Sequence, residues 1–179
     1  FNGHNDFFEE VAKFRSARRI WSKIMKERFN VSRKKALMCR FHVQTAGSTL
    51  TAQQPDNNIV RTSMQALAAV LGGAQSIHTN SKDEALSLPS AKSAQTALRT
   101  QQIIAEESMV SNSVDPLSGS FLIEDLTQKL EHKTFKLIDK IDSLGGAVEA
   151  IKLNFQEQEI SKTAYDFQKS IESKKNIIV

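Results

Sequence analysis

Strand-like segments alternate with helix-like segments in the first part of the chain, and this alternation constrains the fold more than any other feature. Each strand-like segment is short and apolar, and each is followed by a polar loop and a helix-like pattern. In chain order we predict a strand at 36–43, a loop at 44–56, a helix at 57–71, a strand at 74–79, a helical turn at 84–88 and a helix at 90–109. This order is typical of parallel βα units, whose ligands bind in loops at the carboxyl ends of the strands. The sequence therefore predicts an α/β fold.

An amphipathic helix is predicted ahead of the first strand. Apolar residues recur every three or four positions across 6–29, as they do on the buried face of a helix. Asp6 is the expected N-cap, because Glu9 follows three residues later in a pattern that resembles a capping box.

The pattern changes near residue 110, after which helices alone are predicted until the last four positions. The expected helices lie at 121–144, 147–153 and 157–173, and a strand-like pattern returns at 176–179. The change predicts two parts, βα units at 1–110 and a helical extension at 111–179.

Composition excludes several classes of protein. Lys and Arg exceed Asp and Glu by 24 to 20, but the basic residues are spread along helical faces without an aromatic stripe, so no nucleic-acid platform is expected. The single Cys39 rules out an internal disulfide or a thiolate metal cluster, and no metal-ligand spacing occurs around the histidines. No apolar run is long enough to cross a membrane, and no signal peptide pattern is present, so we expect a cytoplasmic protein without a membrane anchor.

Several polar residues near the strands are candidates for a site, and each has an ordinary structural alternative. His42 and His78 lie near predicted strand ends, where a histidine either faces a ligand or is hydrogen-bonded within the fold. Asn80 and Glu84 could hold the hydroxyls of a ribose, or Asn80 could cap a helix with Glu84 solvated in its first turn. Lys35, next to Arg33 and Lys34, could bind phosphate, although the spacing alone favours a solvated loop. No nucleophile, base and acid occur in an arrangement for covalent hydrolysis.

Longer sequence motifs between residues 14 and 120 resemble those of a known family. They are HVQTAGSTLTAQQP at 42–55, NNIVRT at 57–62, QSIHTN at 75–80, DEAL at 83–86, FRSARRIW at 14–21, RTQQII at 99–104 and VDPLSGS at 114–120. Together they resemble the large-chain barrel of methylmalonyl-CoA mutase and its acyl-CoA mutase relatives, across essentially the whole chain.

The resemblance implies a fold and an activity. The fold implied is the C-terminal portion of a (β/α)₈ TIM barrel, about two to three βα units, followed by a helical extension. The activity implied is that of an isomerase that uses adenosylcobalamin for a radical 1,2 rearrangement of a CoA thioester. The partners implied are an acyl-CoA substrate, a cobalamin-binding domain or subunit and the remaining barrel strands, and an oligomer is expected.

The resemblance also implies site residues. Gln44, Asn80 and Glu84 match positions on the cofactor side of the family's site, and Lys35, Gln75 and Arg40 match positions that hold coenzyme A. No catalytic residue is assigned to this segment.

Two features of the family are missing from the chain. None of the histidines at 4, 42, 78 and 132 is preceded by the Asp of the family's Asp-x-His-x-x-Gly cobalamin motif. The residues that read the acyl group would lie upstream of Phe1, so the choice among methylmalonyl, isobutyryl, ethylmalonyl and hydroxyisobutyryl groups is left open.

The length of the chain leads to two hypotheses about its role. A complete barrel takes about 250 residues, so 179 residues predict a segment of a larger chain or complex that is not active alone. The alternative is a non-catalytic half-barrel that docks on a partner, since a half-barrel leaves strand edges unpaired.

Overall fold

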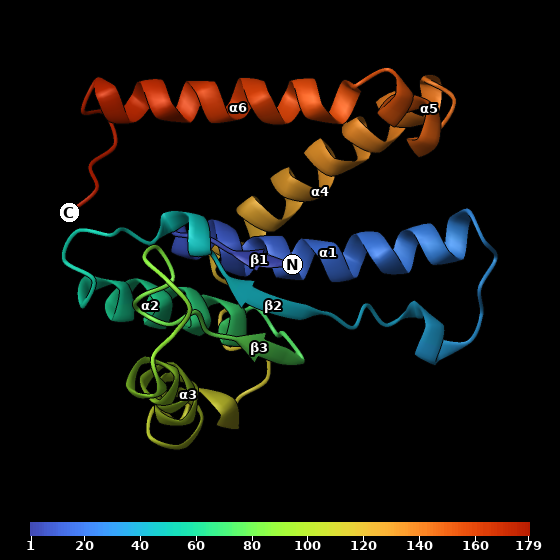
Figure 1. Ribbon diagram of the computed structural model, residues 1–179. Helices are drawn as coiled ribbons and strands as arrows, with labels where there is room; N and C mark the ends of the chain where they lie inside the picture. Colours follow the sequence, from blue (N-terminus) through green and yellow to red (C-terminus); the bar gives the residue numbers. More distant parts are fainter. The chain divides into compact units, whose positions relative to one another are not determined.

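The computed structural model describes all residues from Phe1 to Val179. Three short strands form one parallel sheet in the order β1-β2-β3 (Figure 1). The strands are β1 (Asn2–Gly3), β2 (His42–Thr45) and β3 (Ser76–His78), and the helices that follow them are α1 (Phe7–Glu27), α2 (Asn57–Leu71) and α3 (Ala91–Glu106). The first part of the chain is therefore three consecutive βα units, a mixed α/β structure with a small parallel sheet.

The chain divides into two compact units, Phe1–His132 and Lys133–Val179. The remaining helices are α4 (Phe121–Ser143), α5 (Ala147–Lys152) and α6 (Phe155–Glu172), and short 3₁₀ turns lie at Lys34–Leu37, Gly47–Thr49 and Val110–Asn112. Within the second unit, the Lys140 ammonium lies 4.5 Å from the centroid of the Phe155 ring. The predicted boundary at 110 concerns the end of the βα repeats, which this division does not test, and it stays a prediction.

Most predicted helices are confirmed, whereas the first predicted strand is misplaced. Asp6 caps α1 by accepting from the Glu9 backbone N–H at 3.2 Å. Residues 36–43 do not form one strand, because Ala36 and Leu37 belong to a 3₁₀ turn and the strand begins at His42. The Ala36 N–H closes this turn by donating to the Arg33 carbonyl at 2.9 Å, and the Trp21 indole of α1 donates to the Ala36 carbonyl at 3.0 Å.

Three smaller differences separate the predicted elements from the observed ones. β1 was not predicted, since two residues are too few to show an alternating pattern. No strand forms at 176–179, where the apolar residues find no strand to pair with. The predicted turn at 84–88 is a series of turns, closed by the Ser87 N–H donating to the Asp83 carbonyl at 2.9 Å.

One face of the sheet is covered by α1 and α2. Val43 of β2 is fully buried in a cluster with Phe14 of α1 and Ala69 of α2, and Ile77 of β3 packs against the same cluster. Helix α2 approaches closely because its inner face is small, with the buried residues Ala66, Ala68 and Ala69. Gly72, after α2, is required for the same reason, since a Cβ there would lie 2.6 Å from the Phe14 Cδ2 atom.

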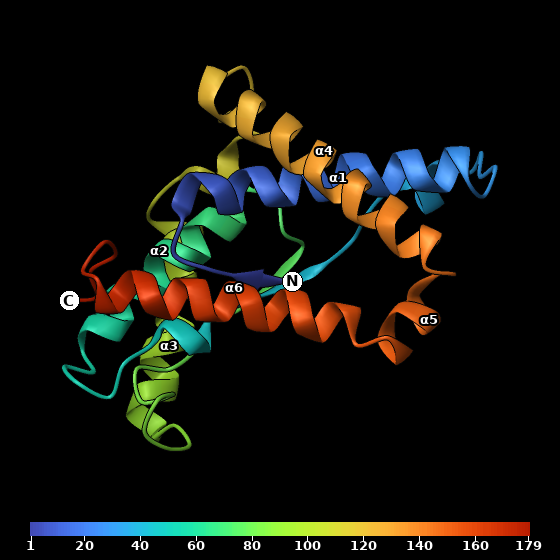
Figure 2. The same cartoon turned by 90° about the horizontal axis from the view of Figure 1, so that it is seen from above.

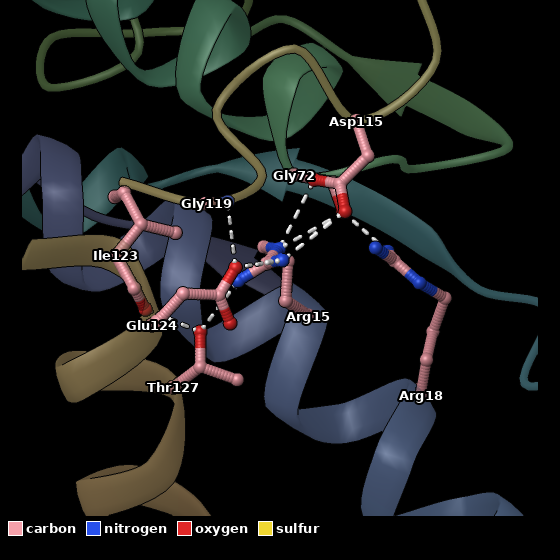
Figure 3. A network of polar contacts seen from close by, with 8 residues as sticks. All are labelled: Arg15, Arg18, Gly72, Asp115, Gly119, Ile123, Glu124 and Thr127. Carbon is pink, nitrogen blue, oxygen red and sulfur yellow. Dashed lines mark hydrogen bonds and ion pairs between the residues drawn. The ribbon is translucent and has the colours of Figure 1, made fainter. Parts of the chain in front are cut away.

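The beginning of α4 contacts α1 through Ile123 and Thr127, and the view from above in Figure 2 shows α4 passing over α1. Val11 of α1, Ala68 of α2 and Ile123 of α4 form a second buried cluster. Arg15 lies beside this cluster and is 9% exposed. Its guanidinium donates to Asp115 at 3.0 Å, to Glu124 at 2.8 Å and to Thr127 Oγ1 at 3.1 Å (Figure 3).

These contacts change the pKa values of the groups involved. Burial lowers the pKa of Arg15, but the hydrogen bonds to Glu124 and Asp115 outweigh it and the net shift is upward. The pKa of Glu124 is lowered because Arg15 and the Gly119 backbone N–H both donate to its carboxylate. Arg15 therefore stays charged and ties the connection that leads into α4 to the middle of α1.

Replacing Arg15 with Met should lower the free energy of unfolding by about 1.5 to 3 kcal/mol, the usual loss for hydrogen bonds to charged groups, because Asp115 and Glu124 are partly exposed and can be solvated when their partner is removed. Urea unfolding measures this difference. The control is Arg99→Met, because Arg99 is exposed and pairs locally with Gln102; its effect should stay within about 0.5 kcal/mol. Equal losses in the two variants would contradict the role of Arg15.

Candidate functional site

The sheet face opposite α1 and α2 is open and polar. Burial alternates along β2, with Val43 and Thr45 buried and with His42 and Gln44 exposed. In β3, Ser76 and His78 are exposed in the same way. The register pairs His42 with Ser76 and Gln44 with His78, so these polar side chains lie in two rows across one face.

Side chains in the two rows lie beside polar side chains of the neighbouring strands and are not buried in the core. His42 Nδ1 lies 2.8 Å from Ser76 Oγ. Asn2 of β1 is exposed and pairs in register with Gln44, which extends the second row to three strands. Both histidines noted in the sequence therefore lie on the open face. A face that carries amide, hydroxyl and imidazole groups without a carboxylate or an ammonium is suited to a polar, extended ligand.

A cluster of amides lies where β2 and β3 end. Gln44 Nε2 donates to Asn80 Oδ1 at 3.1 Å, and Asn80 Nδ2 donates to the Thr45 carbonyl at 3.0 Å. The Asn80 backbone N–H also donates to Thr45 Oγ1 at 2.9 Å. Asn80 caps no helix, since Ser90 is the N-cap of α3. Instead it joins the end of β3 to the end of β2 and leaves Gln44 exposed beside it.

Glu84 approaches the same cluster from the loop after β3. A Cβ on Gly47 would lie 2.9 Å from Asn80 Nδ2 and 3.4 Å from Glu84 Oε1. Gly47 thus allows the loop after β2 to pass close to both side chains, and any larger residue would displace the buried Asn80 amide. Glu84 is exposed, so its carboxylate remains available to a ligand at this edge of the sheet.

Asp83 stabilises the loop that carries Glu84. Ser81 Oγ donates to Asp83 Oδ1 at 2.6 Å, and the Ser90 backbone N–H donates to Oδ2 at 3.1 Å. These hydrogen bonds, the one from Ser81 first, lower the pKa of Asp83 to about 2. Asp83 thus joins Ser81, ahead of Glu84, to Ser90, after it, and holds the loop on both sides of Glu84.

The residues expected to hold coenzyme A lie at the other ends of the strands. Gln75 precedes β3, accepts from the Phe41 backbone N–H at 2.8 Å and donates to the Gly73 carbonyl at 3.0 Å. Arg40 is exposed directly before Phe41, so it lies at the same edge as Gln75. Lys35 is exposed in the 3₁₀ turn that Trp21 holds, and no hydrogen bond or ion pair joins it to Arg40 or Gln75.

The structure thus separates the candidate residues into two groups. Gln44, Asn80 and Glu84 lie together at the carboxyl ends of the strands, whereas Gln75 and Arg40 lie at their amino ends, with Lys35 on the segment before β2. Sequence reasoning missed Gly47, Ser76 and two buried amides of α2, Asn58 and Gln65. A glycine within a polar loop was the available signal for Gly47, but nothing in the sequence marks an amide as buried.

The structure offers neither a metal centre nor a membrane segment. No group of three or more His, Cys, Asp or Glu side chains is placed to hold a metal ion. None of the helices combines the length and the apolar character that crossing a membrane requires. The candidate residues comprise amides, hydroxyls, imidazoles and one carboxylate on the sheet and at the carboxyl ends of its strands, and the exposed cations Lys35 and Arg40 ahead of β2.

Three parallel βα units with polar candidate residues at the ends of the strands define this chain as an α/β protein. The sequence model of the family described as "Methylmalonyl-CoA mutase" matches residues 1–179. The chain belongs to the methylmalonyl-CoA mutase family.

Individual relatives agree with this assignment. The chain is 50% identical over 166 residues to the 2-hydroxyisobutanoyl-CoA mutase large subunit of Aquincola tertiaricarbonis, covering 93% of this chain and 30% of the relative. It is 44% identical over 174 residues to methylmalonyl-CoA mutase of Rhizobium meliloti and to the mitochondrial enzyme of Homo sapiens, covering 97% of this chain and 24% and 23% of those proteins. The chain thus spans between 23% and 30% of the length of these relatives.

The low pKa of Asp83 predicts how stability depends on pH. The folded-state pKa of about 2 lies below the ordinary value of 3.8, so ionised Asp83 stabilises the fold above about pH 4 and loses this contribution as the pH falls toward about 2. Asp83→Asn should therefore unfold more easily than the wild type at neutral pH, and the difference should shrink below about pH 4.

Urea unfolding across this pH range measures the effect. Asp166→Asn is the control, because Asp166 is exposed on α6, and its stability should follow the wild type at every pH. A constant difference between Asp83→Asn and the wild type down to about pH 2 would contradict the ionic role of Asp83.

Proposed function

We propose that the chain provides three βα units of the substrate-binding (β/α)₈ barrel of an adenosylcobalamin-dependent mutase, which rearranges the carbon skeleton of a CoA thioester. The observation that carries the proposal is the open polar sheet face with one candidate group at each end. In a closed barrel this face would line the interior. We call Lys35, Arg40 and Gln75 the coenzyme A group of residues and Gln44, Asn80 and Glu84 the cofactor group of residues. A long ligand lying along the strands would meet the first group at one end and the second at the other.

The cofactor group has the chemistry that a nucleoside ribose requires. The exposed Glu84 carboxylate can accept hydrogen bonds from two hydroxyls, and the Gln44 amide can donate or accept. Asn80 is buried and holds the Gln44 amide in place. When bound, adenosylcobalamin would supply the radical chemistry, and these residues would orient its adenosyl part and limit access of water.

The coenzyme A group supplies charge where phosphates would lie. Lys35 and Arg40 are exposed cations, and an ammonium and a guanidinium are the usual partners of phosphate oxygens. Gln75 shapes this end of the sheet through its bonds to Phe41 and Gly73. The position of Arg40 and Gln75 at the amino ends of the strands, with Lys35 on the segment before β2, supports an acyl-CoA whose nucleotide enters there and whose acyl group points toward Glu84.

The proposal also assigns partners. β1 and β3 each pair with β2 on one side only, and the remaining barrel strands would pair with their free edges. A cobalamin-binding domain or subunit would face the carboxyl ends of the strands. The relatives are named for methylmalonyl-CoA and 2-hydroxyisobutanoyl-CoA. For this chain we propose only the class of substrate, a CoA thioester. We also propose an oligomeric assembly and a cytoplasmic location.

Glu84→Ala in the complete mutase should weaken adenosylcobalamin binding on the order of ten- to a hundredfold, the usual loss for one or two hydrogen bonds to a charged group. Absorbance titration measures the affinity, and turnover should fall while the circular dichroism spectrum is unchanged. Glu106→Ala is the control, because Glu106 is exposed at the end of α3. Unchanged binding and turnover in Glu84→Ala would refute its role at the ribose.

Lys35→Glu should raise the KM for the CoA ester about tenfold and leave kcat nearly unchanged, because a lost phosphate contact weakens binding equally in the ground and transition states. The affinity for an acyl-pantetheine analogue that lacks the nucleotide phosphates should not change. Lys34→Glu, the same charge reversal one residue earlier, is the control for a general electrostatic effect. An equal loss of affinity for the truncated analogue would contradict the phosphate role.

The second candidate function is a non-catalytic half-barrel that docks on a partner chain. The free edges of β1 and β3 favour it, because unpaired strand edges tend to pair with another chain. Light scattering of the isolated 179 residues distinguishes it from a self-sufficient domain, since a monodisperse monomer would argue against the need for a partner. Turnover of a CoA ester by the complete assembly would favour the mutase instead.

A further inference from the structure

Helix α2 carries two buried amides that bind the loops after all three strands. Asn58 and Gln65 are 0% and 2% exposed. They are seven residues apart, close to two helical turns, and therefore lie on the same side of α2. We call Asn58 and Gln65 the α2 amide pair.

Asn58 connects the loop after β2 with the loop after β3. Its Nδ2 donates to the Thr51 carbonyl at 2.8 Å and to the Lys82 carbonyl at 2.9 Å. Its Oδ1 accepts from the Thr51 backbone N–H at 3.1 Å and from Arg61 at 2.7 Å. Both N–H groups of the amide are used, and Lys82 is two residues before Glu84, so Asn58 sets the distance between the Gly47 loop and the Glu84 loop.

Gln65 makes the corresponding connection between the loops after β1 and β2. Its Nε2 donates to Asn5 Oδ1 at 2.7 Å and to Thr49 Oγ1 at 2.8 Å. Its Oε1 accepts from the Ala46 backbone N–H at 2.9 Å. The three loops at the carboxyl ends of the strands are therefore joined through one helix that itself belongs to the packed core.

We propose that the α2 amide pair are positioning residues. They hold Glu84 and Gly47 at the spacing that binding of the adenosyl ribose requires. The inference rests on the proposed function. An amide is the residue type that serves here, because Lys82 and Thr51 present carbonyl oxygens that need a donor while the Thr51 N–H needs an acceptor. A released loop would have to be ordered again when ligand binds, and that entropy loss would lower the affinity.

The test is Asn58→Asp in the complete mutase assembled with its cobalamin-binding part. The substitution keeps the shape and the acceptor but removes both donors. Hydrogen exchange should become about tenfold faster in 82–90, where the Glu84, Leu86 and Ser87 amides are hydrogen-bonded, and the Kd for adenosylcobalamin should rise about tenfold, the effect of one buried polar group left without its partner. The affinity for coenzyme A, whose candidate residues lie at the other strand ends, should change less than about twofold.

Matched variants separate positioning from general destabilisation. Gln65→Glu should accelerate exchange in 46–50 and leave 82–90 close to the wild type. Asn57→Asp, the same change at the neighbouring residue, whose amide bonds locally to Gln54, should alter neither exchange nor binding. Where circular dichroism shows that Asn58→Asp is unfolded, Asn58→Ala takes its place, since it removes the donors without placing a carboxylate opposite two carbonyls.

The outcomes are distinct. Faster exchange confined to 82–90 together with weaker cofactor binding supports the proposal. Wild-type exchange in 82–90, wild-type cofactor affinity, or an equal loss of affinity for adenosylcobalamin and coenzyme A would overturn it. A wild-type assembly that fails to bind adenosylcobalamin would refute the proposed function, whereas the exchange pattern would still decide whether Asn58 holds the loop, because it needs no cofactor.

Discussion

The parallel pairing of β1, β2 and β3 is the constraint on which the rest of the structure depends. Side chains alternate between the two faces of a strand, so burying Val43 and Thr45 under the helices places His42 and Gln44 on the opposite face. Parallel order also brings all carboxyl ends to one edge and all amino ends to the other. The open polar face and its two groups of candidate residues follow from these two facts.

Helix α2 connects the core to the site. Its inner face is small enough for Ala68 and Ala69 to pack against α1, α4 and the sheet. The same helix contributes Asn58 and Gln65 to the loops after the strands. Packing of α2 in the core therefore also positions the loops, and Arg15 provides the corresponding link between α1 and the chain that enters α4.

Local signals made most helices predictable, and their absence explains the misplaced strand. Asp6 with Glu9 marks the start of α1, and Gly72 with Gly73 marks the end of α2. Ala36 to Phe41 are apolar enough to resemble a strand, but in the structure Ala36 bonds to the Trp21 indole and Phe41 stacks on the Phe14 ring, contacts with α1 that a local pattern does not reveal. β1 is recognisable only from its register with β2.

The sequence by itself determined the family, the βα alternation and the candidate residues Gln44, Asn80, Glu84, Lys35, Gln75 and Arg40, because sequence words and periodicity are local properties. Only the tertiary structure decided how those residues are grouped. It placed Asn80 in the interior as a bridge between β2 and β3 and left Glu84 exposed beside Gly47. It also showed that Asn58 and Gln65 join the loops, since burial and hydrogen bonding between distant segments exist only once the sheet and α2 have packed together.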